Sequence, residues 1–196
     1  MTGAVSVSST ASAESPVPLS PVTSPLVSRT GRERQRFAGE ADAKIRLVAG
    51  SIPTRRAESG AWEVLMVTNK HKDSLIFPKG GWETDETAEE AAARESMEEA
   101  GVVGRLTPLD EFAFESKMKG GVKTPCKCSV FVMLVTEVME VWPEGDARSR
   151  SWYAPEEAIR NCKHPWMRDA LRAWGRTEGL DLADGWTGAR VALPGK

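Results

Sequence analysis

One helix with clear boundaries constrains the fold of this 196-residue chain more than any other segment. Thr87 can cap the helix, and Glu90 three residues later completes a capping box. Three alanines at 91–93 favour helix, and Gly101 stands where a left-handed residue commonly ends one. These local signals predict a helix over 87–100, and the segments around it must pack against its apolar side.

Short apolar and β-branched runs, each bounded by Gly or Pro, surround this helix and are typical of strands. The runs cover residues 45–52, 62–68, 75–77, 106–114, 127–138 and 148–153. Two further helices are predicted over 155–160 and 165–176, and each of them opens at a proline. Strands and helices mixed in this order favour an α/β sandwich.

Composition divides the chain into a core and two tails. Residues 1–28 hold eight serines and four prolines, one acid and no base. Such a segment cannot bury enough apolar surface to offset its ordering entropy. We therefore predict a disordered tail over 1–39, one domain over 40–178 and a loose tail over 179–196. The serine-rich, acid-poor start also suits an organelle transit peptide, but the arginines of such peptides are missing from 1–28.

Charge and cysteine content exclude several classes of protein. Lys and Arg number 26 against 28 Asp and Glu, which argues against general nucleic-acid binding. No apolar run approaches the roughly 18 residues of a membrane span. Three cysteines make no disulfide framework, and two histidines exclude a histidine-rich metal site. Any metal must therefore be bound by oxygen. The cytoplasm is the default location, with the nucleus and an organelle as alternatives.

Acidic residues are concentrated on the first helix. Glu95, Glu98 and Glu99 stand at i, i+3 and i+4 and therefore project from one face. Like charges at this spacing repel by a few tenths of a kcal/mol, roughly, for each pair. Mg²⁺ or Mn²⁺, which prefer carboxylate and carbonyl oxygens, would turn this cost into a gain. A solvated acidic face is the alternative interpretation.

The glycine-containing loop before the helix adds a second constraint. Residues 80–102 read GGWETDETAEEAAARESMEEAGV, with seven fixed positions: Gly80, Glu86, Arg94, Glu95, Glu98, Glu99 and Gly101. Such a pattern arises by chance on the order of once in a million chains of this length. It is the Nudix box, on which the chain is identified as a member of the Nudix hydrolase family. Ser96 departs from the family pattern, because that position is usually apolar.

The resemblance covers most of residues 40–175, and FPKGGWE (77–83) is similar to plant and algal members. The chain looks like the branch of diphosphoinositol polyphosphate phosphohydrolases, which overlaps with the diadenosine polyphosphate hydrolases. This implies a Nudix-type α/β/α sandwich with a mixed central sheet. It also implies a metal-dependent pyrophosphohydrolase that cleaves diphosphate linkages in inositol pyrophosphates, diadenosine polyphosphates or both, by in-line attack of water.

Two alternatives stay open beside this function. The first is hydrolysis of other nucleoside diphosphate-linked substrates, namely nucleotide sugars, dinucleotides or capped RNA. The second is a non-catalytic module that senses a nucleotide. Sensors can lose metal ligands without penalty, whereas all three glutamates stand here, so catalysis is the favoured interpretation.

The resemblance also implies roles for single residues. The Gly80 carbonyl, Glu95 and Glu99 would bind Mg²⁺ or Mn²⁺, and Glu98 would be the general base. In some relatives the residue matching Glu95 is the base instead. Arg94 would pair with Glu98 in a catalytic or a structural role, and Glu86 would be structural.

We expect the substrate to be a small-molecule polyphosphate. We expect no membrane partner for the protein, and its sequence indicates no oligomeric state. Its phosphates would be bound by basic residues around the cleft. The candidates are Arg46, Lys70, Lys79, Lys127 and Arg148, of which Lys79 and Lys127 are preferred.

Overall fold

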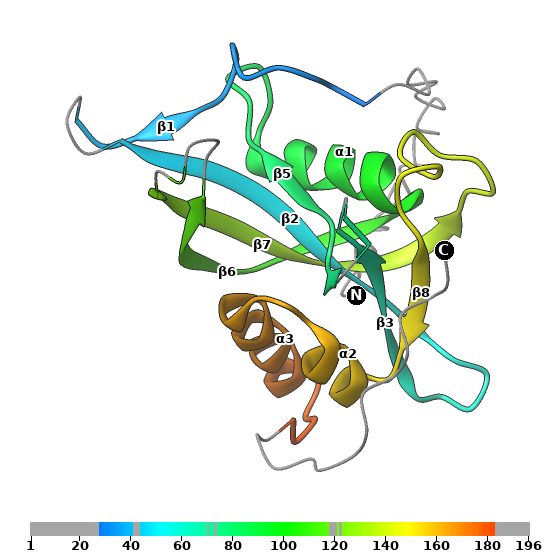
Figure 1. Cartoon of the computed structure of the whole chain (residues 1–196). Coiled ribbons are helices and arrows are strands. Elements are labelled where there is room, and N and C mark those ends of the chain that lie inside the picture. Colours follow the sequence, from blue (N-terminus) through cyan, green and yellow to red (C-terminus); the bar gives the residue numbers. More distant parts are fainter. Residues whose placement is uncertain are drawn as a thin grey trace, which may run out of the picture.

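The computed structural model describes residues 28–40, 44–69, 71–72, 74–117, 121 and 123–182. Within them one eight-stranded sheet combines with three helices (Figure 1). The elements are β1 (Phe37–Ala38), β2 (Ile45–Arg56), β3 (Trp62–Thr68), β4 (Leu75–Ile76), β5 (Lys79–Gly81), α1 (Ala88–Ala100), β6 (Val102–Lys117), β7 (Lys123–Val138), β8 (Arg150–Tyr153), α2 (Pro155–Asn161) and α3 (Pro165–Thr177).

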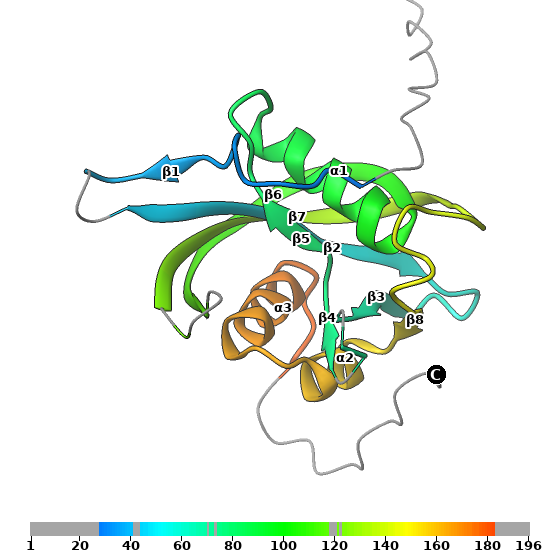
Figure 2. The same cartoon turned by 45° about the horizontal axis from the view of Figure 1, so that its top comes forward.

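The sheet is mixed, and helices cover both of its faces. The main strand order is β4-β3-β2-β7-β6, with β1 and β5 pairing with β2 and β8 pairing with β3. The central pair of β2 and β7 is parallel, and the other pairs are antiparallel. Helix α1 lies on one face and α2 and α3 lie on the other (Figure 2). The predicted α/β/α sandwich with a mixed central sheet is therefore confirmed.

Helix α1 forms as its local signals predict. Thr87 is the N-cap, and its side chain and that of Glu90 form both hydrogen bonds of the capping box. Gly101 ends the helix in the left-handed conformation with φ of 60°. Arg150 of β8 donates to the carbonyls of Ala100 and Gly101 at the helix end, where carbonyls have no partner within the helix.

Ser96, the departure from the family pattern, has a partner in the sheet. Its hydroxyl donates to the Ala92 carbonyl over 2.6 Å and lies 2.6 Å from the Ser51 hydroxyl of β2. Both serines are fully buried. A polar contact thus joins α1 to the sheet where an apolar side chain was expected.

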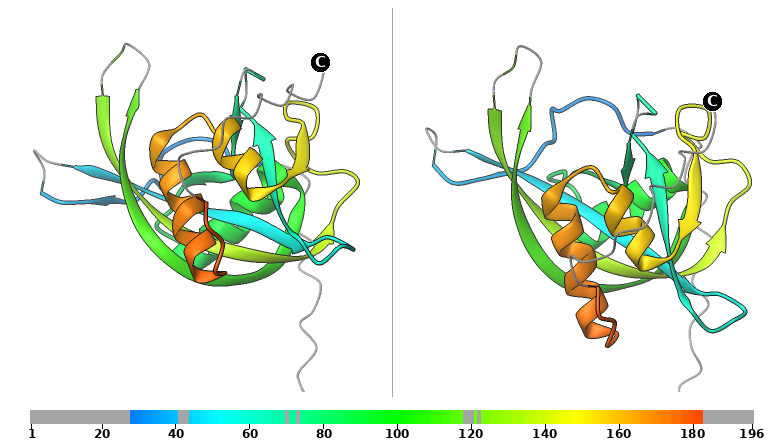
Figure 3. Two further views of the ribbon diagram at one scale, coloured as in Figure 1. Left: turned by 90° about the horizontal axis from the view of Figure 1, so that it is seen from below. Right: turned by 60° about the horizontal axis from the view of Figure 1, so that its bottom comes forward.

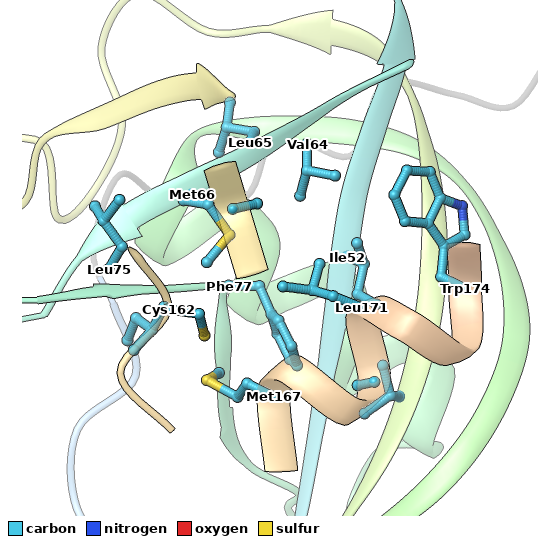
Figure 4. Close-up of a cluster of buried hydrophobic side chains, with 14 of the residues drawn as sticks. Ile52, Val64, Leu65, Met66, Leu75, Phe77, Cys162, Met167, Leu171 and Trp174 are labelled. Atoms are coloured by element: carbon cyan, nitrogen blue, oxygen red, sulfur yellow. The ribbon is translucent and has the colours of Figure 1, made fainter. Parts of the chain in front are cut away.

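The main hydrophobic core lies between the sheet and α3. Met167, Leu171 and Trp174 of α3 pack toward Ile52 and Phe77 (Figure 4). The sheet curves around α3 on this side (Figure 3). The three cysteines are free and buried, as expected of reduced core residues. None of the helices in the described part of the chain is long and apolar enough to cross a membrane.

The structure extends the predicted domain at its N-terminus. Residues 28–39, assigned to the tail, contact the domain, because β1 pairs with β2 and the segment before β1 binds the loop that precedes α1. That segment has no apolar periodicity, and its contacts are made by arginine side chains, Gln35 and backbone groups instead. At the C-terminus the predicted loose tail is wrong for residues 179–182, because Leu182 is buried in the main core and Leu180 packs against it. The remaining predicted tail residues, 1–27 and 183–196, lie outside the described residues. Strands β6 and β7 are also longer than the predicted runs 106–114 and 127–138, because polar residues at their ends pair with each other as well.

Candidate active site

Strand β5 places the loop glycines directly against α1. Gly80 pairs with Ala49 of β2, on the face of the sheet that α1 covers. A Cβ atom at position 80 would lie 2.0 Å from Oε1 of Glu95. Only glycine therefore allows the Glu95 carboxylate to approach the backbone of β5 this closely.

Arg94 connects the loop to the carboxylates of α1. Its guanidinium binds Glu86 through two hydrogen bonds of 2.9 and 2.7 Å, and it donates to the Gly81 carbonyl over 2.9 Å. It also lies 2.7 Å from Glu95 and 3.4 Å from Glu98. Burial works against this charge, but the hydrogen bonds to Glu86 and the charge of Glu95 prevail and raise the pKa of Arg94. Arg94 is placed to position two of the three carboxylates.

The three glutamates are buried rather than solvated. Glu95, Glu98 and Glu99 are 8%, 5% and 6% exposed. Burial raises the pKa of all three carboxyls, and for Glu95 the charge of Glu99 adds to it and brings the pKa to about 7. The solvated acidic face is therefore excluded, because three acids share a desolvated site.

Glu98 and Glu99 each have partners of their own. The backbone N–H of Arg29 donates to Glu98 over 3.2 Å. Glu99 forms a buried ion pair with Arg148 and accepts a 3.0 Å hydrogen bond from the backbone N–H of Lys79. Every carboxylate of the trio is thus held by at least one hydrogen-bond donor, which fixes the direction in which it points.

The donor set fits a hard divalent cation. It consists of carboxylate and carbonyl oxygens. Because Gly80 has no side chain, the Glu95 carboxylate can lie close to the backbone of β5. Within the described residues no three acidic, imidazole or thiol side chains converge as a ready metal cage. The carboxylates are paired with arginines instead, Glu95 and Glu98 with Arg94 and Glu99 with Arg148.

The structure separates the predicted phosphate-binding residues. Arg46 of β2 and Lys79 of β5 are half-buried. Lys127 faces the α1 side of β7, like Phe131, and pairs with Glu111 at 2.8 Å. Arg46 instead stands beside Cys126, on the opposite face.

Arg148 and Lys70 are the other two predicted phosphate-binding residues. Arg148 is buried and donates to Glu99, to Glu144 over 2.6 Å and to the Thr68 carbonyl over 3.0 Å. Its side chain is therefore occupied inside the protein. Lys70 lies outside the described residues.

Three residues near the site escaped the sequence analysis. Gln35 and Arg29 belong to the segment that composition assigned to the tail. Glu144 accepts from Arg148, and its charge adds to the burial that raises the pKa of Glu98 and Glu99. It lies outside the Nudix box, and no local spacing marks it. The arginines at 29, 34 and 36 were the available signal, because they complement the acids at 83, 85 and 86.

Comparison with known proteins identifies the family. The NUDIX domain family matches residues 44–174. Nudix hydrolase 16, mitochondrial, of Arabidopsis thaliana is 45% identical over 159 residues, covering 74% of this chain and 86% of that protein. Nudix hydrolase 21, chloroplastic, of the same plant is 41% identical over 163 residues, covering 81% and 79%. Diphosphoinositol polyphosphate phosphohydrolase 3-alpha of Mus musculus is 39% identical over 137 residues, covering 67% and 77%.

A solved structure shares the fold. The C. elegans Ap4A hydrolase in a binary complex superposes with a TM-score of 0.54 at 22% identity, covering 68% of this chain and 97% of that one. Together with the Nudix box and its buried carboxylates, these matches show that the chain belongs to the Nudix hydrolase family, whose members act on phosphoanhydride bonds.

Proposed function

We propose that this chain is a metal-dependent pyrophosphohydrolase that cleaves a diphosphate linkage in inositol pyrophosphates, with diadenosine polyphosphates as the second candidate substrate. The observation that carries the proposal is the trio of buried carboxylates next to Gly80. Burying three acids in one site is costly unless a ligand compensates their charge. A non-catalytic sensor has no need of such a site, which argues against that alternative.

Each glutamate has a role in this proposal. Glu95, Glu99 and the Gly80 carbonyl would hold Mg²⁺ or Mn²⁺, which when bound neutralises phosphate oxygens and favours in-line attack. Glu98 would accept the proton of the attacking water, since burial raises its pKa toward the range that suits a general base. Glu95, whose pKa burial raises to about 7, is the alternative base.

The placement of the basic residues refines the substrate site. Arg46 and Lys79 keep the proposed role in phosphate binding, because both are partly accessible. Arg148 is better placed to hold Glu99 than to bind a phosphate. Lys127 has less support in this role, because its ammonium group is already paired with Glu111 at 2.8 Å.

Inositol pyrophosphates are favoured over adenine-containing substrates for two reasons. The mouse relative named as a diphosphoinositol polyphosphate phosphohydrolase is 39% identical to this chain. In addition, Trp82, the aromatic residue of the box loop, is already engaged. Arg36 covers its ring at 4.7 Å, and its Nε1 donates to the Glu86 carbonyl over 2.8 Å. One face of the Trp82 ring is therefore already covered, and the residue packs against the buried cluster of Ala49, Ala91, Ala92 and Phe131, which makes it less suited to stack on a base.

Turnover assays test the proposal. Purified full-length protein is incubated with diphosphoinositol pentakisphosphate or diadenosine hexaphosphate, with Mg²⁺, Mn²⁺ or EDTA, and the products are separated. We expect faster turnover of the inositol substrate, no turnover in EDTA, and loss of about 10²-fold or more in kcat for Glu98→Gln, typical of removing a general base. Glu89→Gln is the matched control, since Glu89 is an exposed acid of the same helix.

Each outcome decides something. An inert wild type, or a Glu98→Gln variant as active as Glu89→Gln, contradicts the catalytic proposal. Equal activity in EDTA contradicts metal dependence. Preference for the dinucleotide, or turnover only of nucleotide sugars, dinucleotides or capped RNA, moves the substrate to the corresponding alternative.

Location in the cell is a separate proposal. Composition favours the cytoplasm, but relatives that carry "mitochondrial" or "chloroplastic" in their names support organelle targeting instead. We propose that the serine-rich residues 1–28 direct the chain to an organelle. Fusing these residues to a fluorescent protein in plant cells tests this. Organelle fluorescence supports the proposal, and diffuse fluorescence restores the cytoplasmic expectation.

A further inference from the structure

The N-terminal strap, defined here as residues 29–36, is fastened to the box loop along its length. The N–H of Arg36 donates to the Trp82 carbonyl and the N–H of Thr84 to the Arg34 carbonyl, both over 2.8 Å. The ion pair of Arg34 with Asp85, at 2.8 Å, adds a side-chain contact. The strap therefore runs beside α1 and its preceding loop (Figures 1 and 2).

Gln35 is the one strap residue whose side chain is buried, at 9% exposure. Its amide nitrogen donates to three carbonyls, those of Arg36, Leu47 and Trp82, over 2.9, 2.7 and 3.2 Å. A carbonyl accepts only from a donor, so the amide cannot be turned over without losing all three bonds. The amide oxygen is consequently fixed on the opposite side.

That oxygen accepts a 2.7 Å hydrogen bond from Nε of Arg46. The bond uses the inner nitrogen of the guanidinium and so sets the plane of the group while leaving its outer edge to other ligands. Burial lowers the pKa of Arg46, and the nearby charge of Glu95 opposes this shift.

Gly81 makes room for this contact. A Cβ atom at position 81 would lie 2.5 Å from Oε1 of Gln35 and 3.2 Å from Nη2 of Arg46. The box loop thus approaches both ends of the pair, and a side chain there would force them apart.

We propose that Gln35 is a positioning residue for Arg46, which it holds in the orientation that receives a substrate phosphate. Gln35 then supports the substrate site, whereas its strap neighbour Arg34 serves only to attach the strap to the box loop. This inference rests on the proposed function, in which Arg46 binds a phosphate. It assigns Gln35 no contact with the substrate.

A double-mutant cycle separates positioning from simple stabilisation. Gln35→Met keeps the length of the side chain and removes both of its polar atoms. We expect KM for diphosphoinositol pentakisphosphate to rise about tenfold, as for one lost well-placed interaction, with kcat within about twofold of wild type. In an Arg46→Ala background the same change should leave KM unaltered, because Gln35 acts through Arg46. Arg34→Met is the matched control, since it removes a strap ion pair remote from Arg46, and its KM should equal that of wild type.

Two additions keep the test decisive. Gly81→Ala crowds the pair without deleting it, and it replaces Gln35→Met if that variant does not fold. The second measurement is the Kd of inorganic tripolyphosphate, determined by calorimetry for the same set of variants, and it does not depend on turnover. A wild type without turnover would contradict the proposed function, but the Kd values would still test the role of Gln35. An equal rise of KM or Kd in both backgrounds, or no rise in either, would overturn the inference.

Discussion

The buried contact between Ser51 and Ser96 makes a sharp prediction about how α1 is held on the sheet. The Ser96 hydroxyl donates its proton to the Ala92 carbonyl, so Ser51 must be the donor in the 2.6 Å contact between the two serines. The two positions are therefore not equivalent. Ser96→Ala leaves a buried donor at Ser51 without its acceptor, whereas Ser51→Ala leaves Ser96 still bonded to Ala92.

The magnitudes follow from this asymmetry. An orphaned buried hydroxyl costs about 1–3 kcal/mol, and the higher helix propensity of alanine offsets roughly 0.5 kcal/mol of it. Ser96→Ala should thus lower the free energy of unfolding by about 0.5–2.5 kcal/mol. Ser51→Ala loses one hydrogen bond and should cost about 0.5–1.5 kcal/mol. The double variant removes both polar groups and should be more stable than Ser96→Ala alone.

Urea denaturation followed by tryptophan fluorescence measures all four proteins, and the chain offers seven tryptophans as probes. The two serines are in contact, so we expect a coupling energy of about 0.5–3 kcal/mol between them. If the two single changes add to within about 0.5 kcal/mol, or if Ser96→Ala is as stable as wild type, the reasoning is refuted.

Three further predictions concern charged groups. Arg94→Met should lower the free energy of unfolding by about 3–5 kcal/mol, since it removes the main ion-pair partner of the buried Glu86 carboxylate. Denaturant titration checks this against the Arg94→Met/Glu86→Gln protein, which should be more stable. Lys127→Met should change KM less than twofold and stability by less than about 1 kcal/mol, because its pair with Glu111 is exposed. A large rise of KM would show that Lys127 contacts the substrate. Burial lowers the pKa of His164, and nearby lysines and Arg168 add to this. The stability that neutral His164 contributes is present above its unfolded pKa of about 6.5 and is lost as the pH falls through the lower folded value, so the melting temperature should fall less steeply with acid in His164→Gln.

Local signals predicted those parts of the protein that local contacts build. Helix α1 is the clearest case, because its capping box and terminal glycine lie within fifteen residues. The parallel pairing of β2 with β7 has no such signature, since it joins segments about eighty residues apart. The same limit explains why Arg148 was expected on the surface. Its burial depends on Glu99 and Thr68, which approach it only through the tertiary fold.

The strap shows a second reason for a missed contact. A segment without apolar periodicity is assigned to a tail because hydrophobic burial is the usual reason for order. Here arginines of the strap bind acids and carbonyls of the box loop, as when Arg29 pairs with Glu83 at 2.8 Å. Charge complementarity between distant segments is visible in the composition, but composition does not show which segments meet.

The arrangement of charge around α1 resolves the conflict that the Nudix box creates. Three glutamates on one helical face repel, and burial increases that repulsion because water no longer screens it. Arg94 pairs with Glu95 and Glu98 and Arg148 pairs with Glu99, while the backbone N–H groups of Arg29 and Lys79 donate to Glu98 and Glu99. The carboxylates are therefore oriented by the protein itself, and a divalent cation bound there would have to compete with the arginines for their oxygens. Preorganisation of this kind lowers the ordering cost of binding, which is why the arginines, although they compete for the same atoms, belong to the site.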